Sequence, residues 1–481
     1  MQGMRNRTKS TDRPAMTWIP WSGGFYPYEV RRRRAEALTF VGMWAEAAAQ
    51  AREMLAFAES LGDEAMMAAA RSQLGQALEK RGEFQEAQAL LELAADAYEH
   101  LGERRNHCSV LGALSLCHMR RGDYGRALEL SLGQLELAGK LGDRRMTGMA
   151  VSNIGNIHIY RGEHLKAGGF YERMMELARE LEDRRGVCMA LGNLGMVQMM
   201  AGDHPRALAC YREGLDLARR MGDVQTEMNI TGNLGNCLYM TGDMSGAVES
   251  FRDQLALARR LGDRVSEGRA VGNLGAMHEE LGEFGPALEC YETKLALART
   301  TGDRQGLCLA MNNLGAAHLE MGRHAEAGRC FVESEALARE LGLKYVLCNA
   351  LYLSVRNDLE SSPKGNEGKR LDEAARVAAE CGRSEVETRA RILSLKLLAG
   401  RDREAGSKGL GELLGRSSCE EEQAMVVFAL WQVIGDQALR DKAAGMYEIL
   451  HSKMPKHEYR VRLNEMKKAA GRQGMQSDDK G

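Results

Sequence analysis

Residues 203–219 read DHPRALACYREGLDLAR and lie between two glycines, Gly202 and Gly222. The apolar residues of this stretch follow the i, i+3, i+4 spacing of an amphipathic helix. Each glycine suits the left-handed conformation that often follows a helix C-terminus. An acidic residue after the glycine, such as Asp203 or Asp223, can cap the next helix. The stretch therefore predicts one helix with a turn at each end.

The same pattern returns with a period of 40 residues, carried by two interleaved series of glycines. One series comprises Gly62, Gly102, Gly142, Gly222, Gly262, Gly302, Gly342 and Gly382, and the other comprises Gly42, Gly82, Gly122, Gly162, Gly202, Gly242, Gly282 and Gly322. Only Glu182 interrupts the first series. Candidate helix caps follow five of these glycines, namely Asp63, Asp143, Asp223, Asp263 and Asp303. Each 40-residue unit is therefore predicted to be a helical hairpin.

Composition narrows the class of protein. The 481 residues include 65 basic and 67 acidic side chains, a balance that argues against a nucleic-acid binder. No apolar run reaches the ~18 residues of a membrane span, and the N-terminus lacks the apolar core of a secretory signal. We therefore expect a cytoplasmic protein. The sequence contains no P-loop, HExxH or GxSxG motif, so we expect neither an enzyme nor a cofactor.

Cysteines and histidines recur at equivalent places in the repeat. The sequence has eleven cysteines, and the spacing of Cys108, Cys188, Cys308 and Cys348 by multiples of 40 favours buried free thiols in a reducing compartment for the whole set. Four histidines share another repeat position, one in each of four repeats: His118, His158, His278 and His318. Side chains spread in this way cannot converge on one metal ion. We predict satisfied core histidines and no metal site.

The units also share internal residues. A Leu-Gly pair in each first helix is followed by an Ala-x3-aromatic pattern in each second helix, as in Leu194-Gly195 with Ala207 and Tyr211 or Leu234-Gly235 with Ala247 and Phe251. These residues resemble the tetratricopeptide repeat family, in a long 40-residue variety similar to G-protein-signalling modulators and bacterial signalling arrays. The family's late proline is missing, so the second helix can continue to the glycine.

This resemblance implies an all-α, right-handed superhelical solenoid of about nine to eleven helical hairpins, with the first helix of each hairpin lining the concave side. We expect a non-repeat segment over 1–23, the repeat array over 24–383, and degenerate helical repeats with a closing helix over 384–470. A disordered tail is expected over 471–481. The aromatic segment around Trp18 and Trp21 is interpreted either as a cap on the array or as a docking peptide.

The clearest candidate site is a ladder of asparagines at one repeat position: Asn153, Asn193, Asn233, Asn273 and Asn313. Asparagine is an indifferent helix former, so five in register require an explanation. The amide carries donors and an acceptor that suit the backbone of a bound peptide. In related repeat families these asparagines contact ligand peptides. Alternatively, they bond to the neighbouring hairpin and fix the repeat spacing.

Residues one turn away from the ladder extend the candidate site. Asn156, Asn236 and Arg269 are added to the peptide-binding set. The same strip contains several methionines: Met149, Met189, Met196, Met200 and Met240. They either form an adaptable apolar surface for a partner or belong to the core. The glycines beside the ladder, such as Gly195 and Gly235, are assigned to close helix packing.

The sequence therefore favours a non-catalytic scaffold that binds an extended or helical peptide of a partner protein in its concave groove. The alternative is a regulatory or sensor module of a bacterial signalling system whose kinase, cyclase or ATPase lies elsewhere. This alternative is based on the direct passage of the chain into an incomplete first repeat. Neither hypothesis includes nucleic acid as a partner, and the oligomeric state is left open.

Overall fold

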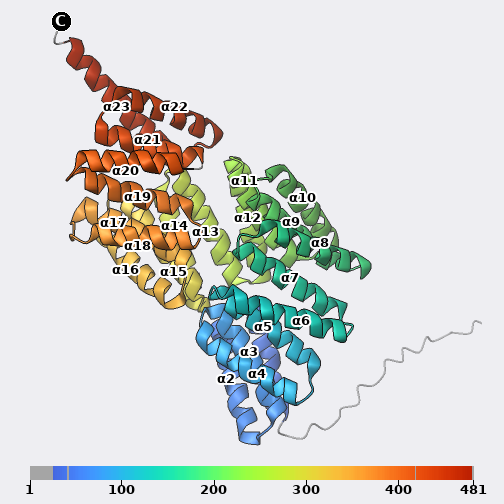
Figure 1. The fold of residues 1–481 in the computed structure, drawn as a ribbon. Helices are drawn as coiled ribbons and strands as arrows, with labels where there is room; N and C mark the ends of the chain where they lie inside the picture. Colours follow the sequence, from blue (N-terminus) through green and yellow to red (C-terminus); the bar gives the residue numbers. More distant parts are fainter. Residues whose placement is uncertain (1–24, 41–42, 418, 479–481) are drawn as a thin grey trace, which may run out of the picture.

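The computed structural model describes residues 25–40, 43–417 and 419–478, and all 23 regular elements in these ranges are α-helices (Figure 1). The first twelve are α1 (Phe25–Phe40), α2 (Trp44–Leu61), α3 (Glu64–Arg81), α4 (Phe84–His100), α5 (Arg104–Arg120), α6 (Tyr124–Lys140), α7 (Arg144–Tyr160), α8 (His164–Glu180), α9 (Arg184–Met200), α10 (His204–Met221), α11 (Val224–Met240) and α12 (Met244–Leu261). The others are α13 (Arg264–Leu281), α14 (Phe284–Thr301), α15 (Arg304–Glu320), α16 (His324–Leu341), α17 (Lys344–Ser361), α18 (Glu367–Glu380), α19 (Ser384–Ala399), α20 (Arg403–Arg416), α21 (Glu420–Ile434), α22 (Gln437–Lys453) and α23 (His457–Asp478).

The turns form as the glycine series predicts. Every glycine of the two series that lies in the described residues has a positive φ, and each ends or follows a helix. All five predicted aspartate caps accept a hydrogen bond from the backbone N–H three residues later, at 2.8–3.1 Å. The 40-residue unit is therefore a helical hairpin whose ends are fixed by a left-handed glycine and a capping carboxylate.

Glu182, the one interruption of the first glycine series, adopts the glycine conformation. Its φ is 53°, the only positive φ of a non-glycine residue in the described parts of the chain. Replacing Glu182 with glycine removes a left-handed strain of roughly 1 kcal/mol. We expect the free energy of unfolding to rise by about that amount, measured by urea denaturation. Glu213→Gly, in the exposed middle of α10, is the control and should lower it by about 1 kcal/mol. Equal effects of the two changes would contradict this explanation.

The Leu-Gly pair and the Ala-x3-aromatic pattern meet inside each hairpin. A Cβ placed on Gly155, Gly195, Gly235, Gly275 or Gly315 would lie only 2.6–2.7 Å from the ring of the aromatic residue on the second helix. These rings, Tyr171, Tyr211, Phe251, Tyr291 and Phe331, are fully buried. The glycines therefore serve close helix packing, as predicted, because each leaves room for one ring.

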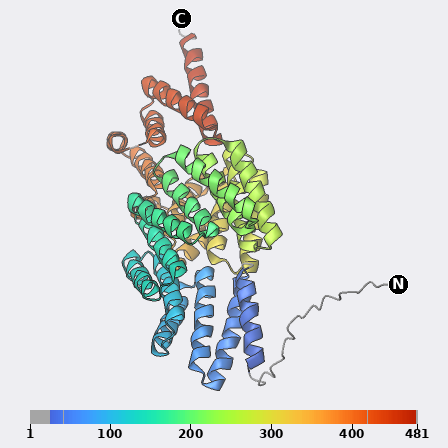
Figure 2. The ribbon, with the colours of Figure 1, turned by 90° about the vertical axis from the view of Figure 1, so that its right-hand side faces the viewer.

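Successive hairpins stack into a superhelical solenoid, which brings distant repeats together. The first helices, blue in Figures 1 and 2, lie directly below the yellow helices α15 and α16. The turn at Gly302, between α14 and α15, approaches Ala45 of α2 and Arg81 of α3. Gly82 lies close to Leu341 of α16. The superhelix therefore returns to its own first repeats, and these contacts enclose space between them.

The two ends of the array depart from the regular repeat. Tyr28 of α1 is buried, and its hydroxyl donates to the carbonyl of Met66 at 2.8 Å. The expected segment 1–23, with its aromatic residues, lies outside the described residues. At the end of the segment 384–470 lies α23, which continues to Asp478, so part of the tail expected to be disordered is helical. No helix in the described ranges is long and apolar enough to cross a membrane.

All eleven cysteines are free thiols, as predicted. Six are fully buried, four are half-buried, and Cys419 is exposed. Burial raises the pKa of the Cys117 thiol to about 12, so this group is protonated and inert at neutral pH. The prediction of burial is wrong for Cys419, which precedes α21 outside the regular repeats.

Candidate peptide-binding surface

Successive first helices contact one another, α5 with α7, α9 with α11 and α15 with α17, which is the arrangement expected of the helices on the inner side of the superhelix. One face of each first helix is therefore assigned to that side. It carries four residues spaced i, i+4, i+7 and i+11, which we call the inner stripe of that helix. On α7, α9 and α11 the stripes are Met149, Asn153, Asn156 and Tyr160; Met189, Asn193, Met196 and Met200; and Asn229, Asn233, Asn236 and Met240. On α13 and α15 they are Arg269, Asn273, Ala276 and Glu280; and Leu309, Asn313, Ala316 and Glu320. All twenty residues are half-buried or exposed.

The structure divides the asparagine ladder. Asn153 donates to the side-chain oxygen of Gln134 on the preceding hairpin at 3.2 Å. At this position the asparagine bonds to the neighbouring hairpin and fixes the repeat spacing, which is the alternative to peptide binding. Four members, Asn193, Asn233, Asn273 and Asn313, are half-buried and have no side-chain hydrogen bond within the part of the chain that the structure describes. Their amides are thus available to a ligand.

The three further candidates also differ from one another. Asn156 accepts a hydrogen bond of 2.6 Å from the hydroxyl of Tyr171 and is tied to its own hairpin. Asn236 is exposed on α11, and Arg269 is exposed on α13. Arg269 also lines a cavity between the first and the middle repeats. Only Asn236 and Arg269 therefore offer an accessible polar group.

Four of the five methionines of the inner stripes belong to the surface. Met149, Met189, Met200 and Met240 are each between 46% and 52% exposed, and Tyr160 is 50% exposed. Tyr160 also stacks on Tyr124, with ring centroids 6.2 Å apart. The interpretation as core residues is wrong for these four methionines, because about half of each side chain is exposed. It fits Met196, which is half-buried and packs against a core cluster. The result is an apolar strip beside the free asparagines.

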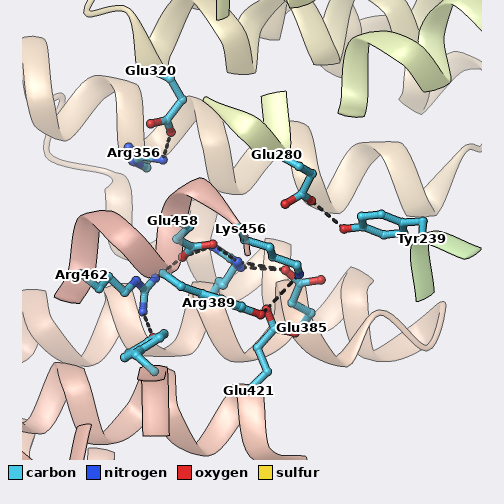
Figure 3. A network of polar contacts seen from close by, with 12 residues as sticks. Tyr239, Glu280, Glu320, Arg356, Glu385, Arg389, Glu421, Lys456, Glu458 and Arg462 are labelled. Atoms are coloured by element: carbon cyan, nitrogen blue, oxygen red, sulfur yellow. Dashed lines mark hydrogen bonds and ion pairs between the residues drawn. The ribbon is translucent and has the colours of Figure 1, made fainter. Parts of the chain in front are cut away.

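The C-terminal end of the inner surface is closed by charged groups instead (Figure 3). Glu458 at the start of α23 pairs with Arg389 of α19 at 2.8 Å, and Lys456 pairs with Glu421 of α21 at 3.2 Å. Burial alone would raise the pKa of Glu458. The guanidinium groups of Arg389 and Arg462 outweigh it and lower that pKa to about 2. The start of α23 is therefore fixed against the inner surface by ion pairs.

A second group of carboxyls lies at the end of α13. Tyr239 donates to Glu280 at 2.7 Å (Figure 3), and Tyr291 donates to the neighbouring Glu279 at 2.7 Å. Burial raises the pKa of Glu279 to about 7, although the hydrogen bond from Tyr291 acts in the opposite direction. The equivalent residues of other repeats include Met199, Tyr239 and Leu319, while α3 carries a second glutamate, Glu79. Glu279 is thus a carboxyl at a position that most repeats fill with apolar or aromatic groups.

The raised pKa of Glu279 predicts a pH-dependent cost. Because its folded pKa exceeds the unfolded value of ~4.5, stability is lost as pH rises from about 4.5 through 7. Glu279→Gln keeps the acceptor for Tyr291 and removes the charge. We expect it to raise the free energy of unfolding by roughly 1–2 kcal/mol at pH 8.5 and by little at pH 5. Exposed Glu289→Gln is the control. A gain that does not depend on pH would contradict this prediction.

Three of the four equivalent histidines are satisfied as predicted. The Nδ1 atoms of His118, His158 and His278 lie 3.1, 2.9 and 2.6 Å from a carboxylate five residues later. His318 has Arg323 at that place, and its Nδ1 is buried without a hydrogen-bond partner. Burial, together with Arg323, lowers the pKa of His318. Across the described ranges no three His, Cys, Asp or Glu side chains come together as metal ligands.

Family models identify the family to which the repeats belong. Models of the tetratricopeptide repeat match residues 67–101, 146–220 and 226–300. The chain is a tetratricopeptide repeat protein. A model of anaphase-promoting complex subunit 5 also matches residues 307–356 of this tetratricopeptide repeat protein. Comparison with curated protein sequences gives no match.

Solved structures share the fold of this tetratricopeptide repeat protein. A Rap protein in complex with competence and sporulation factor is 12% identical, with 74% of this chain and 99% of that chain covered and a TM-score of 0.51. The apo form of the quorum sensor NprR from B. thuringiensis is 13% identical, with 69% and 97% covered and a TM-score of 0.50. At these identities the likeness concerns the all-α superhelical fold alone.

Proposed function

We propose that this chain is a non-catalytic interaction scaffold of the cytoplasm. It binds an extended or helical peptide segment of a partner protein along the inner stripes of α7, α9, α11, α13 and α15. The observation that carries the proposal is the set of four asparagines in register whose amides have no partner within the described structure. They lie beside half-exposed methionines, so polar backbone contacts and apolar side-chain contacts are offered together.

The spacing of the helices sets the length of the bound segment. Neighbouring helices pack about 8–10 Å apart, and an extended strand rises about 3.3 Å per residue. Each free asparagine would therefore meet roughly every third ligand residue, and four of them span on the order of ten residues. Met-rich stripes on α7 and α9 suit apolar ligand side chains. Arg269 on α13 suits an acidic one.

Two solved relatives in fold support a regulatory variant of this proposal. One is described as complexed with competence and sporulation factor, and the other as a quorum sensor. In this second hypothesis, the chain is the sensor of a bacterial signalling system, and a bound segment changes its contact with a kinase, cyclase or ATPase. Purification of the chain together with such an enzyme tests this variant.

Replacement of three free ladder asparagines tests the main proposal. The triple variant Asn193→Ala, Asn233→Ala and Asn273→Ala loses no hydrogen bond within the described structure, and Ala is the better helix former. We expect its thermal stability to be equal or higher. Binding of a partner captured from native lysate should fall at least tenfold.

The matched control replaces three asparagines outside the inner stripes, Asn106, Asn366 and Asn464, which are exposed. It should retain the partner. A folded triple ladder variant that binds the partner as well as the wild type does would contradict the proposed role of the ladder.

A further inference from the structure

Where the superhelix returns to its first repeats, it borders a partly open cavity of about 590 Å³. One wall comes from the first repeats and includes Trp44 of α2 and Phe84 of α4. The opposite wall comes from α11 and α13–α15 and includes Arg269 and Lys294. The cavity continues from the inner stripes, because Asn229, Arg269 and Leu309 are the first stripe residues of their helices and line it together.

The acidic groups in the walls of this cavity already have partners. Glu79 is buried and lies 3.0 Å from the ammonium of Lys80 and 3.8 Å from the guanidinium of Arg120. Asp263 and Asp303 accept hydrogen bonds from backbone N–H groups as the caps of α13 and α15. None of these three carboxylates forms an ion pair with Arg269 or Lys294 in the described structure, although Asp303 lies close enough to raise the pKa of Lys294.

Two cations in the same walls remain unpaired. Arg269 and Lys294 have no ion-pair or hydrogen-bond partner within residues 25–40, 43–417 and 419–478. The third cation of this wall, Arg264, pairs with Glu267 at 3.3 Å. The side chain of Lys294 lies over Gly272, where a Cβ would come within 2.8 Å of its Nζ. The sequence thus leaves space for an ammonium that it does not neutralise.

The repeat itself does not require these charges. At the position of Arg269, other repeats carry Met149, Met189, Asn229 and Leu309. At the position of Lys294, they carry Gln134, Met174, Gly214, Gln254 and Ser334. Gln134 and Gln254 lie against glycines just as Lys294 does. Uncharged residues therefore satisfy the packing at both positions, and the two cations are specific to this cavity.

We propose that the cavity binds an anionic group, a carboxylate or a phosphate, with Arg269 and Lys294 donating hydrogen bonds to its oxygens. The amides of Gln225 and Asn229 line the same space and offer further donors. Trp44 and Phe84 provide aromatic surface for the part of the ligand that carries the anion. The proposal rests on the proposed function only where that anion belongs to the peptide in the groove.

Electrostatics gives the reason why an anion would be held here. Burial lowers the pKa of Lys294 to about 8; the negative charge of Asp303 acts in the opposite direction, and the positive charge of Arg269 adds a smaller lowering. At pH 7 the ammonium is still charged and poorly solvated, which costs free energy in the empty cavity. An anion with two or more oxygens would neutralise both cations at once. Such charge-assisted hydrogen bonds are among the strongest that proteins make.

Titration calorimetry of the full chain at pH 7 with inorganic phosphate, at constant ionic strength, tests the proposal. We expect saturable binding by the wild type. The double variant Arg269→Met and Lys294→Gln should bind at least tenfold more weakly. Both new residues already occupy the equivalent positions in other repeats, so the fold is retained. Arg252→Met removes an exposed cation of α12 and should change binding less than twofold. Absence of saturable binding by the wild type, or equal affinity of the double variant, would overturn the proposal.

Protection of Lys294 from acetic anhydride, read by mass spectrometry, provides a second measurement. Phosphate should reduce its acetylation at least fivefold without protecting Lys166, which is exposed on α8. A partner segment that displaces phosphate would support a peptide-borne anion, and simultaneous binding would support a separate small anion. If the ladder variant still binds its partner, the proposed role of the ladder is wrong, but the phosphate measurements keep their meaning. The two proposals therefore fail separately.

Discussion

Gly235→Ala is expected to destabilise the protein by roughly 1–3 kcal/mol, the usual cost of an extra methyl group in a packed core. The new Cβ would lie 2.7 Å from Cε1 of Phe251, a ring that is 1% exposed and cannot move into solvent. Alanine in an ordinary helix interior would instead gain about 1 kcal/mol over glycine. Urea denaturation of the purified variant measures the change.

Gly133→Ala provides a control in which the same substitution has the opposite sign. This glycine lies inside α6, and a Cβ there would meet nothing within 4 Å. We expect a gain of about 0.5–1 kcal/mol from helix propensity alone. A stabilising effect of Gly235→Ala would contradict the conclusion that the Leu-Gly pair exists to accommodate the aromatic ring of the second helix.

Glu458→Ala is expected to release the start of α23 from the inner surface. It leaves Arg389 largely buried without the carboxylate that it contacts through two hydrogen bonds, at 3.1 and 2.8 Å. Removing one partner of a fully buried ion pair costs about 3–5 kcal/mol. The Glu458 side chain is 33% exposed, so we expect a smaller loss, roughly 2 kcal/mol. Hydrogen exchange should show this loss as faster exchange of the backbone amides of α19–α23. Glu448→Ala, at an exposed position of α22, should have no such effect.

The depressed pKa of Glu458 adds a pH dependence to this prediction. Because the folded pKa of about 2 lies below the unfolded value of ~4.5, the stabilisation is fully present above about pH 4.5. It is lost as pH falls from 4.5 toward 2. The difference in protection between wild type and Glu458→Ala should therefore shrink over that window. A difference that is the same at pH 7 and pH 3 would show that Glu458 acts through packing and not through its charge.

Local structure could be predicted from the sequence because it is determined by neighbouring residues. Glycines such as Gly222 and caps such as Asp223 fix the helix ends within a few residues of chain. The return of the superhelix, with Gly302 against Ala45, depends on small rotations summed over many hairpins. The docking of α23 through Glu458 joins residues 69 apart that no periodic pattern links. Neither feature has a local sequence signal.

The register of the candidate site was predictable, but the state of its side chains was not. The period of 40 residues places the asparagines in one row. Whether Asn153 is free depends on Gln134, and whether Asn156 is free depends on Tyr171, each on another helix. Lys294 did have a signal in the sequence, because it is the one charged residue at a repeat position otherwise filled by Gln, Met, Gly, Ala or Ser. A comparison of the second helices position by position would have found it.

The most direct test of the proposed groove is photo-crosslinking from its inner face. A photoreactive phenylalanine would replace Met189, which is 49% exposed beside Asn193 on α9, or, as the control, Leu165, which is 94% exposed on α8. After illumination in native lysate, we expect a crosslinked partner from position 189 and none from position 165, with the crosslink mapping to one short segment of that partner. A partner captured from position 165 and not from position 189 would contradict recognition on the inner stripes.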